Sequence, residues 1–315
     1  MHLLVYLPLL VPLVGAGAAG RLAERLEPRL ATWLLTVSAV LLATASGVAL
    51  TALAATAIGQ IHLVAALGHW SGRILRRDDP AALWIARVAC VLLVAAVGGS
   101  VVTMVRRGRA VRDAARTARS LPGRRRLSVL ADPAPQAYAL PGRPGRVVVS
   151  TGMLRALDRD ERRVLLAHER AHLDCRHHRF VLVAQCAAAA NPVLRPVATA
   201  VAYTVERWAD EHAARATADR RLVARTISKA ALLTVRHRRV PGVVLAIAAD
   251  RLGPVPRRVA ALLAEPPRRR TLLLSATVAV LVVATLSTVV VCRDLDSLFD
   301  LARVAHRWQA RPAAA

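Results

Sequence analysis

Residues 168–178 read HERAHLDCRHH and contain four histidines in eleven positions. His168 and His172 are four residues apart in a stretch whose apolar pattern predicts a helix. Because side chains at i and i+4 lie one above the other on a helix, both imidazoles can face one metal ion. Asp158 predicts the N-cap of this helix, and Glu161 completes a capping box. The stretch therefore predicts a metal-binding helix.

Glu169 directly follows the first of these histidines. Its carboxylate would point toward the open coordination position of a zinc ion held by the two imidazoles. There it can act as a general base that takes the proton from water as the water attacks a carbonyl. This arrangement is the HExxH pattern of zinc peptidases. The alternative is a surface helix whose histidines have ordinary hydrogen-bond partners.

His178 is one candidate for the third metal ligand, because it occupies the last position of the longer pattern HExxHxxGxxH. In that pattern a glycine ends the helix, whereas here the position is Cys175 and the apolar residues that follow predict a continuing helix. Six residues beyond His172 is about 240° around such a helix, so His178 would face away from the metal. We therefore expect His177 and His178 to belong to a basic helix face.

Glu206, in VERWADEHAA (205–214), is the other candidate for the third ligand. An Asn-Pro pair at 191–192 interrupts the apolar stretch between the two segments and predicts a reversal of the chain. Two antiparallel helices from that turn would return Glu206 to the level of His172. Asp210, one turn further on, could accept the far N–H of a ligating histidine.

The composition places this helix in a membrane protein. Of 315 residues, 55% are hydrophobic but only 3% are aromatic, which suits lipid-facing helices better than a soluble core. Four stretches are long enough to span a bilayer, namely 3–20, 31–56, 83–105 and 271–292. The formal net charge of +25 resides in arginines beside these apolar runs, a pattern of membrane topology. No recognition motif accompanies the charge, so we expect no nucleic acid as a partner.

Basic flanks predict the orientation of the chain. Arginines cluster in 106–126 and 268–270, which places the segment between them in the cytoplasm. The sequence thus predicts four parts. They are a membrane domain with three spans and an outer amino terminus (1–105), a cytoplasmic metal-binding domain (106–270), a fourth span (271–292) and a short extracytoplasmic tail (293–315).

The cytoplasmic domain is predicted to combine helices with two short strands. LSVLA (127–131) and GRVVVS (145–150) favour strands, and the turn-rich stretch DPAPQAYALPGRPG (132–145) separates them. We expect the second strand, with Val147, Val148 and Val149, to be the free edge to which a substrate peptide adds. A covered, purely structural strand is the alternative.

Two quoted stretches carry a resemblance to a known group of enzymes. GRVVVSTGMLRALDRDERRVLLAHERAH (145–172) and ERWAD (206–210) resemble the membrane-integral gluzincin metallopeptidases, which include HtpX-type, CAAX-prenyl-type and BlaR/MecR-type proteases. The resemblance implies a mainly α polytopic protein whose cytoplasmic zincin-like α+β domain lies between the third and fourth membrane helices. It further implies one Zn²⁺ bound by His168, His172 and Glu206, with Glu169 as the catalytic base. Asp210 would accept a hydrogen bond from a ligating histidine.

The BlaR/MecR type matches furthest, since it also has three spans, a cytoplasmic zinc domain and a fourth span. This chain has no penicillin-binding domain after the last span, so we expect no direct β-lactam binding. The expected function is a membrane-bound zinc metalloendopeptidase that cleaves a cytoplasmic, repressor-type protein, with membrane lipid and a sensor in the membrane as further partners.

Two other functions stay open, an HtpX-like quality-control protease and a non-catalytic scaffold or sensor with a structural zinc site. In the HtpX-like protease, the apolar stretch 180–203 would be a re-entrant or peripheral element.

Candidates for contacts to the substrate or the transition state are Tyr203, His212 and Arg258, the last in PRRVAALL (256–263).

Overall fold

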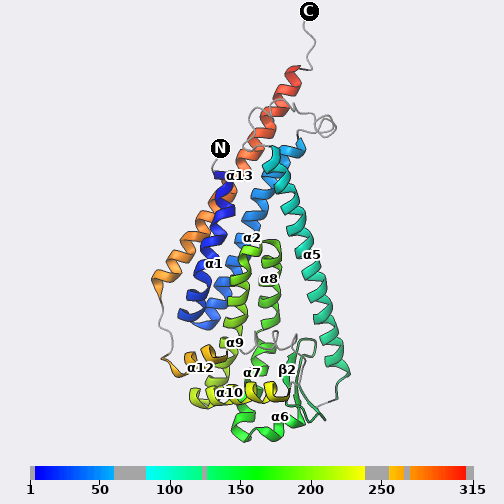
Figure 1. Ribbon diagram of the computed structural model, residues 1–315, viewed down its shortest axis with the longest axis vertical. Coiled ribbons are helices and arrows are strands. Elements are labelled where there is room, and N and C mark those ends of the chain that lie inside the picture. The colour runs from blue at the N-terminus through cyan, green and yellow to red at the C-terminus, as the bar shows by residue number, and fades with distance from the viewer. Residues whose placement is uncertain (1–3, 60–82, 123–125, 238–254, 266–269, 310–315) are drawn as a thin grey trace, which may run out of the picture.

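The computed structural model describes residues 4–59, 83–122, 126–237, 255–265 and 270–309. Within these ranges the chain is mainly helical and forms one three-stranded sheet. Figure 1 shows the sheet and the shorter helices at one end of an elongated bundle of long helices. The expected combination of a helical bundle with a small α+β part is therefore present.

Among the described residues, four helices are long and apolar enough to cross a membrane. They are α1 (Leu7–Arg25), α2 (Pro28–Gly59), α5 (Leu83–Ser120) and α13 (Thr271–Gln309), and a short 3-10 helix, η1 (Leu4–Tyr6), precedes α1. They contain the four predicted spans, except for the first residues of the chain. The chain is thus a multi-pass membrane protein.

The helices α5 and α13 run well past the predicted spans. The third span was expected to end at residue 105, but α5 continues through an arginine-rich stretch to Ser120, and α13 continues beyond Cys292. Arginine has a high helix propensity, so a helix need not end where its apolar composition ends. The predicted domain boundary at 105–106 therefore lies inside one continuous helix. Most of the basic run 268–270 lies outside the described residues.

The sheet has the strand order β1-β3-β2. β1 (Leu127–Leu130) runs parallel to β3 (Arg146–Ser150), whereas β2 (Ala137–Leu140) runs antiparallel to it. The sequence predicts only turns where β2 lies, because its four residues are too few to show an alternating pattern between flanking prolines. The prediction that β3 is a free edge is wrong, since β3 pairs on both sides and its three valines are buried.

Two helices follow β3 without a long connection, α6 (Thr151–Ala156) and α7 (Arg159–Asp174). Asp158 caps α7 by accepting hydrogen bonds from two backbone N–H groups of its first turn, and the Glu161 side chain accepts the N–H of Asp158 at 2.9 Å. The predicted capping box is confirmed. It fixes the start of α7, which follows the central strand after the short helix α6.

The predicted hairpin consists of α8 (His177–Ala190), η2 (Pro192–Leu194) and α9 (Arg195–Thr217). At the turn, the Asn191 amide donates a hydrogen bond of 2.9 Å to the Ser46 hydroxyl on α2. Figure 1 shows α8 and α9 rising from the end with the sheet into the bundle. One core contains Leu22, Leu35 and Leu42 of α1 and α2 together with Ala184, Ala188, Leu194 and Val201 of the hairpin. The two predicted domains therefore share a core.

The helices α10 (Arg220–His237) and α12 (Val255–Leu263) complete the end that holds the sheet. The Arg220 guanidinium donates hydrogen bonds to the backbone carbonyls of Leu262 at 2.8 Å and Ala261 at 2.9 Å. Because these carbonyls belong to the last turn of α12, they have no partner within that helix. Arg220 thus fixes α12 against α10.

Candidate metal centre

His168 and His172 present their rings to one point beside α7. Their Nε2 atoms are 3.2 Å apart, and His168 is buried while His172 is half-buried. Two ring nitrogens at this distance share either a proton or a metal ion between them. The i, i+4 spacing therefore brings the two imidazoles together on one face of the helix, as the sequence predicts.

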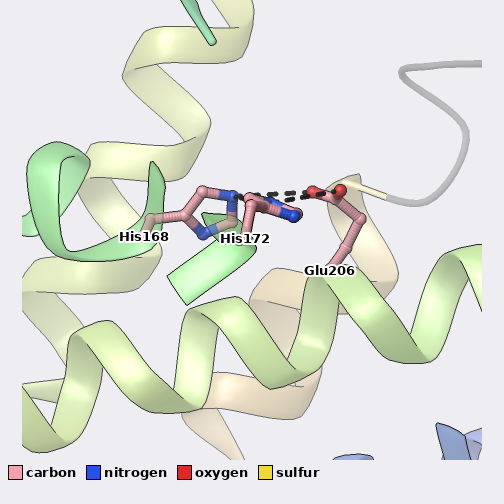
Figure 2. A group of neighbouring side chains, drawn as sticks. All are labelled: His168, His172 and Glu206. Atoms are coloured by element: carbon pink, nitrogen blue, oxygen red, sulfur yellow. Dashed lines mark hydrogen bonds and ion pairs between the residues drawn. The ribbon is translucent and has the colours of Figure 1, made fainter. Parts of the chain in front are cut away.

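Glu206 reaches the same point from α9. Figure 2 shows its carboxylate directed at the two imidazoles. One carboxylate oxygen lies 3.6 Å from Nε2 of His168, and the other lies 3.6 Å from Nε2 of His172. The three ligand atoms are all within 4.8 Å of one another. The hairpin thus brings together the three residues predicted as ligands, and His178 is not among them.

These residues fit a zinc ion. Two imidazole nitrogens and one carboxylate oxygen form the donor set of zinc sites that keep a fourth position open. Burial alone would lower the pKa of His168, but its contacts with Asp210 and Glu206 raise this pKa to about 10. Burial lowers the pKa of His172 to about 4, so its ring is neutral. The carboxylates of Asp210 and Glu206 therefore stabilise a positive charge at His168, and a zinc ion bound between the ligand atoms would supply such a charge.

Glu169 lines the cavity next to this group. Burial raises the pKa of its carboxyl group, and the nearby backbone of Ala139 in β2 partly opposes this shift. A carboxyl group with a raised pKa accepts a proton more readily than an ordinary carboxylate does. Its position allows it to exchange a proton with a molecule in the cavity.

Asp210 and Arg258 form a buried pair behind the metal ligands. Oδ1 of Asp210 lies 3.0 Å from Nδ1 of His168. Arg258 donates to both Asp210 oxygens, at 2.8 and 2.6 Å, and its third nitrogen lies 3.0 Å from Glu206. Burial would raise the pKa values of Glu206 and Asp210, but the charge of Arg258 keeps both below their usual range. Both carboxylates therefore stay ionised and oriented.

His177 belongs to the site, although the sequence predicts it on a basic surface. The α7 helix does not continue as expected but ends at Asp174, and Arg176 adopts a left-handed conformation with φ of 52°. The break turns His177 inward, where it is 1% exposed and its Nδ1 lies 3.1 Å from Nδ1 of His172. The prediction for His177 is wrong, because a left-handed residue other than glycine gives no clear sequence signal.

A cavity of about 310 Å³ opens beside the three ligands. Besides Glu169 and Arg258, its lining consists mainly of small and aliphatic side chains from α7 and α10. They are Val164, Leu165, Thr226, Ile227, Ala230, Ala231, Thr234 and Val235, with Ala137 from β2 and Met153 from α6. This surface can hold an apolar side chain next to the metal ligands.

The other predicted contact residues lie elsewhere. Val147, Val148 and Val149 are at most 1% exposed inside the sheet, so they cannot contact a substrate peptide. Tyr203 and His212 are absent from the cavity lining, and Tyr203 instead packs under the Arg257 guanidinium at 4.7 Å. Of the side chains named as substrate or transition-state contacts, only Arg258 reaches the cavity.

Comparison with known families gives one finding. Residues 103–190 match the model of peptidase family M48. The match covers the sheet, the metal-binding helix α7 and α8, and it ends before Glu206 in α9. It supports a metallopeptidase function that depends on zinc. Neither the search of curated proteins nor the search of solved structures returned a match.

Proposed function

We propose that the chain is a membrane-bound, zinc-dependent metalloendopeptidase that hydrolyses peptide bonds of a protein substrate at the cytoplasmic face of the cell membrane. The observation that carries this proposal is the convergence of His168, His172 and Glu206 from two helices on one point next to Glu169. The family match over α7 supports the same chemistry.

The residues around the site divide the work of peptide hydrolysis. Zinc held by the three ligands would polarise the scissile carbonyl and make water more acidic. Glu169 takes the proton from the attacking water and delivers it to the leaving amine. The Asp210 carboxylate, 3.0 Å from Nδ1 of His168, would keep that ring oriented, while Arg258 holds the Glu206 oxygen that it contacts.

The substrate peptide would bind along β2 rather than β3. Within the sheet, β2 pairs only with β3, so its outer edge has backbone groups available for a further strand. The backbone of Ala139 on this strand lies close enough to Glu169 to lower the pKa of its carboxyl group. A peptide added here would pass its carbonyl groups over the metal ligands.

A regulatory protein in the cytoplasm is the favoured substrate, with activation by a sensor in the membrane. The basic part of α5 supports a cytoplasmic active site, because arginines accumulate on that side of membranes. An HtpX-like quality-control protease is the second candidate. The packing of the α8–α9 hairpin among the spanning helices supports it, because an active site close to the membrane would suit membrane-protein substrates. A scaffold with structural zinc is disfavoured, because a closed site has no use for Glu169.

The first test compares the detergent-purified wild type with Glu169→Gln and with Arg170→Gln, an exposed neighbour on the same helix. We expect the wild type and Arg170→Gln to cleave an unfolded protein and to carry one zinc ion per chain. Glu169→Gln should keep the zinc and lose at least about a hundredfold in rate, because it removes the base. Equal activity of Glu169→Gln and wild type would refute the proposed mechanism.

A second test separates the two biological roles. Cells that carry Glu169→Gln in place of the wild-type chain should accumulate the uncleaved substrate, which quantitative proteomics can detect. Accumulation of one cytoplasmic protein supports a regulatory protease. Accumulation of many membrane proteins supports quality control instead.

Reporter fusions after Gly59 and after Ser120 would test the orientation of the chain in the membrane. We expect the first fusion to lie outside the cell and the second to lie in the cytoplasm.

A further inference from the structure

We propose that His177 is a positioning residue for the metal ligand His172, an inference that rests on the metal site of the proposed function. Nδ1 of His177 lies 3.1 Å from Nδ1 of His172, whose Nε2 faces His168 and Glu206. A neutral imidazole has one N–H and one lone pair. When Nε2 of His172 binds a metal, its Nδ1 carries the hydrogen, and Nδ1 of His177 accepts it.

The break between α7 and α8 creates this contact. In an unbroken helix, a residue five positions after His172 would lie about 140° around the axis, well away from the metal face. Arg176, at φ 52° and ψ 43°, interrupts the helix, and the side chain of the next residue then faces His172. The contact therefore depends on a backbone conformation that residues other than glycine seldom adopt.

Aromatic packing holds the His177 ring in place. Its centroid lies 4.8 Å from the Trp208 ring on α9, two residues after the ligand Glu206. Trp208 in turn contacts Phe180, whose ring lies 4.8 Å from Trp33 on α2. A buried ring packed against an apolar face has few rotamers, so its acceptor atom stays directed at His172.

His172 is the polar partner of the His177 ring among the described residues. Nε2 of His177 is buried and has no hydrogen-bond partner among the described residues. A buried imidazole that served only packing could be replaced by an aromatic ring without this unsatisfied atom. The two imidazole ligands thus have different supports, a carboxylate for His168 and a neutral imidazole for His172. Such supports usually tune metal affinity.

The test measures zinc affinity of the full-length protein in detergent by competition with a chelator. His177→Phe keeps a ring but removes the acceptor, so we expect zinc affinity to fall roughly tenfold to a hundredfold. His177→Asn places an amide oxygen where Nδ1 lies, and its affinity should stay within about threefold of wild type. His178→Phe, a change at the half-buried neighbour, is the matched control and should bind like wild type.

A spectroscopic measurement accompanies the affinities. In Co²⁺-substituted protein, the visible absorption bands should shift in His177→Phe and match wild type in His177→Asn, because only the first variant releases the His172 ring. Wild-type zinc affinity in His177→Phe, or equal weakening in Phe and Asn variants, would overturn the inference. Should His177→Phe not fold, the smaller His177→Leu takes its place with the same expectations. A wild type that binds no zinc would instead refute the proposed function.

Discussion

At the scale of single residues, Asp210 serves two buried partners at once. It lies 3.0 Å from the ring of His168 and forms a two-pronged pair with the Arg258 guanidinium. Asp210 is 1% exposed and Arg258 is 8% exposed, so neither charge has water to replace a lost partner. Removing one partner of a buried pair costs more than the pair itself contributes.

We therefore expect Asp210→Asn to lower both stability and metal affinity. The free energy of unfolding should fall by roughly 3 kcal/mol, because the charge of Arg258 loses its main partner. Zinc affinity should fall roughly tenfold or more, because the His168 ring loses a charged acceptor. Thermal unfolding in detergent and chelator competition measure the two effects. Asp160→Asn, in an exposed pair with Arg163, is the control and should change stability by less than about 0.5 kcal/mol.

Zinc binding should release about one proton at pH 7.5. The pKa of His168 in the metal-free protein is about 10, so this ring is protonated at pH 7.5 and must lose its proton to bind the metal. His172, with a pKa of about 4, is already neutral. Apparent zinc affinity should therefore rise with pH, about tenfold per unit, up to the pKa of His168. Calorimetry in buffers of different ionisation enthalpy measures this proton, and a binding enthalpy independent of the buffer would contradict the prediction.

At the scale of elements, the junction between the sheet and α6 depends on a close approach of two backbones. Gly152 lies in the first turn of α6, and its N–H donates a hydrogen bond of 2.9 Å to the carbonyl of Asp132. A Cβ atom at Gly152 would lie 2.0 Å from the carbonyl oxygen of Pro133. The loop before β2 can therefore stay close to α6 only if this residue has no side chain.

Gly152→Ala should destabilise the protein by about 1–3 kcal/mol, because the backbone around Pro133 must move away from the new methyl group. Gly108→Ala is the matched control. Its Cβ would meet nothing within 4 Å, and alanine in the middle of α5 should raise stability by up to about 1 kcal/mol. Thermal unfolding of both variants in detergent checks the difference, and equal melting temperatures would show that the loop adapts without cost.

At the scale of the whole molecule, a buried arginine joins the hairpin to the first membrane helix. Arg207 on α9 is 4% exposed, and its guanidinium donates to the backbone carbonyls of Ala23, Glu24 and Leu26. These carbonyls lie at the end of α1, where helix carbonyls have no partner in the helix and carry partial negative charge. The helix that supplies Glu206 is thus fixed to a spanning helix.

Arg207→Met should loosen this connection. Methionine keeps much of the length but donates no hydrogen bond, so buried carbonyls lose their partner at a cost of roughly 2 kcal/mol. We expect a lower melting temperature in detergent, together with weaker zinc binding if α9 shifts. Arg215→Met, at an exposed position on the same helix, should change neither. Unchanged stability of Arg207→Met would show that α1 and α9 are held mainly by their apolar contacts.

Local patterns in the sequence are enough to predict the spans, the capped α7 helix and the spacing of His168 and His172. Each depends on a period or a cap within about 20 residues, which the chain expresses without help from distant contacts. Glu206 could also be found, because the helix lengths on either side of the turn at Asn191 make it level with His172.

Tertiary structure decided what no local pattern expresses. Strand order depends on pairing between separated segments, so the sequence alone could not show that β3 is central and that β2 provides the edge beside Glu169. The inward turn of His177 depends on the left-handed Arg176, and the pairing of Arg258 with Asp210 joins residues 48 positions apart. The sequence by itself determined the candidate metal ligands and the membrane helices, because these follow from spacing and composition. Asp210 could be predicted beside the ligands from its place one turn after Glu206, but the roles of Arg258 and His177 were decided only by packing, because these side chains meet the site after the chain has folded.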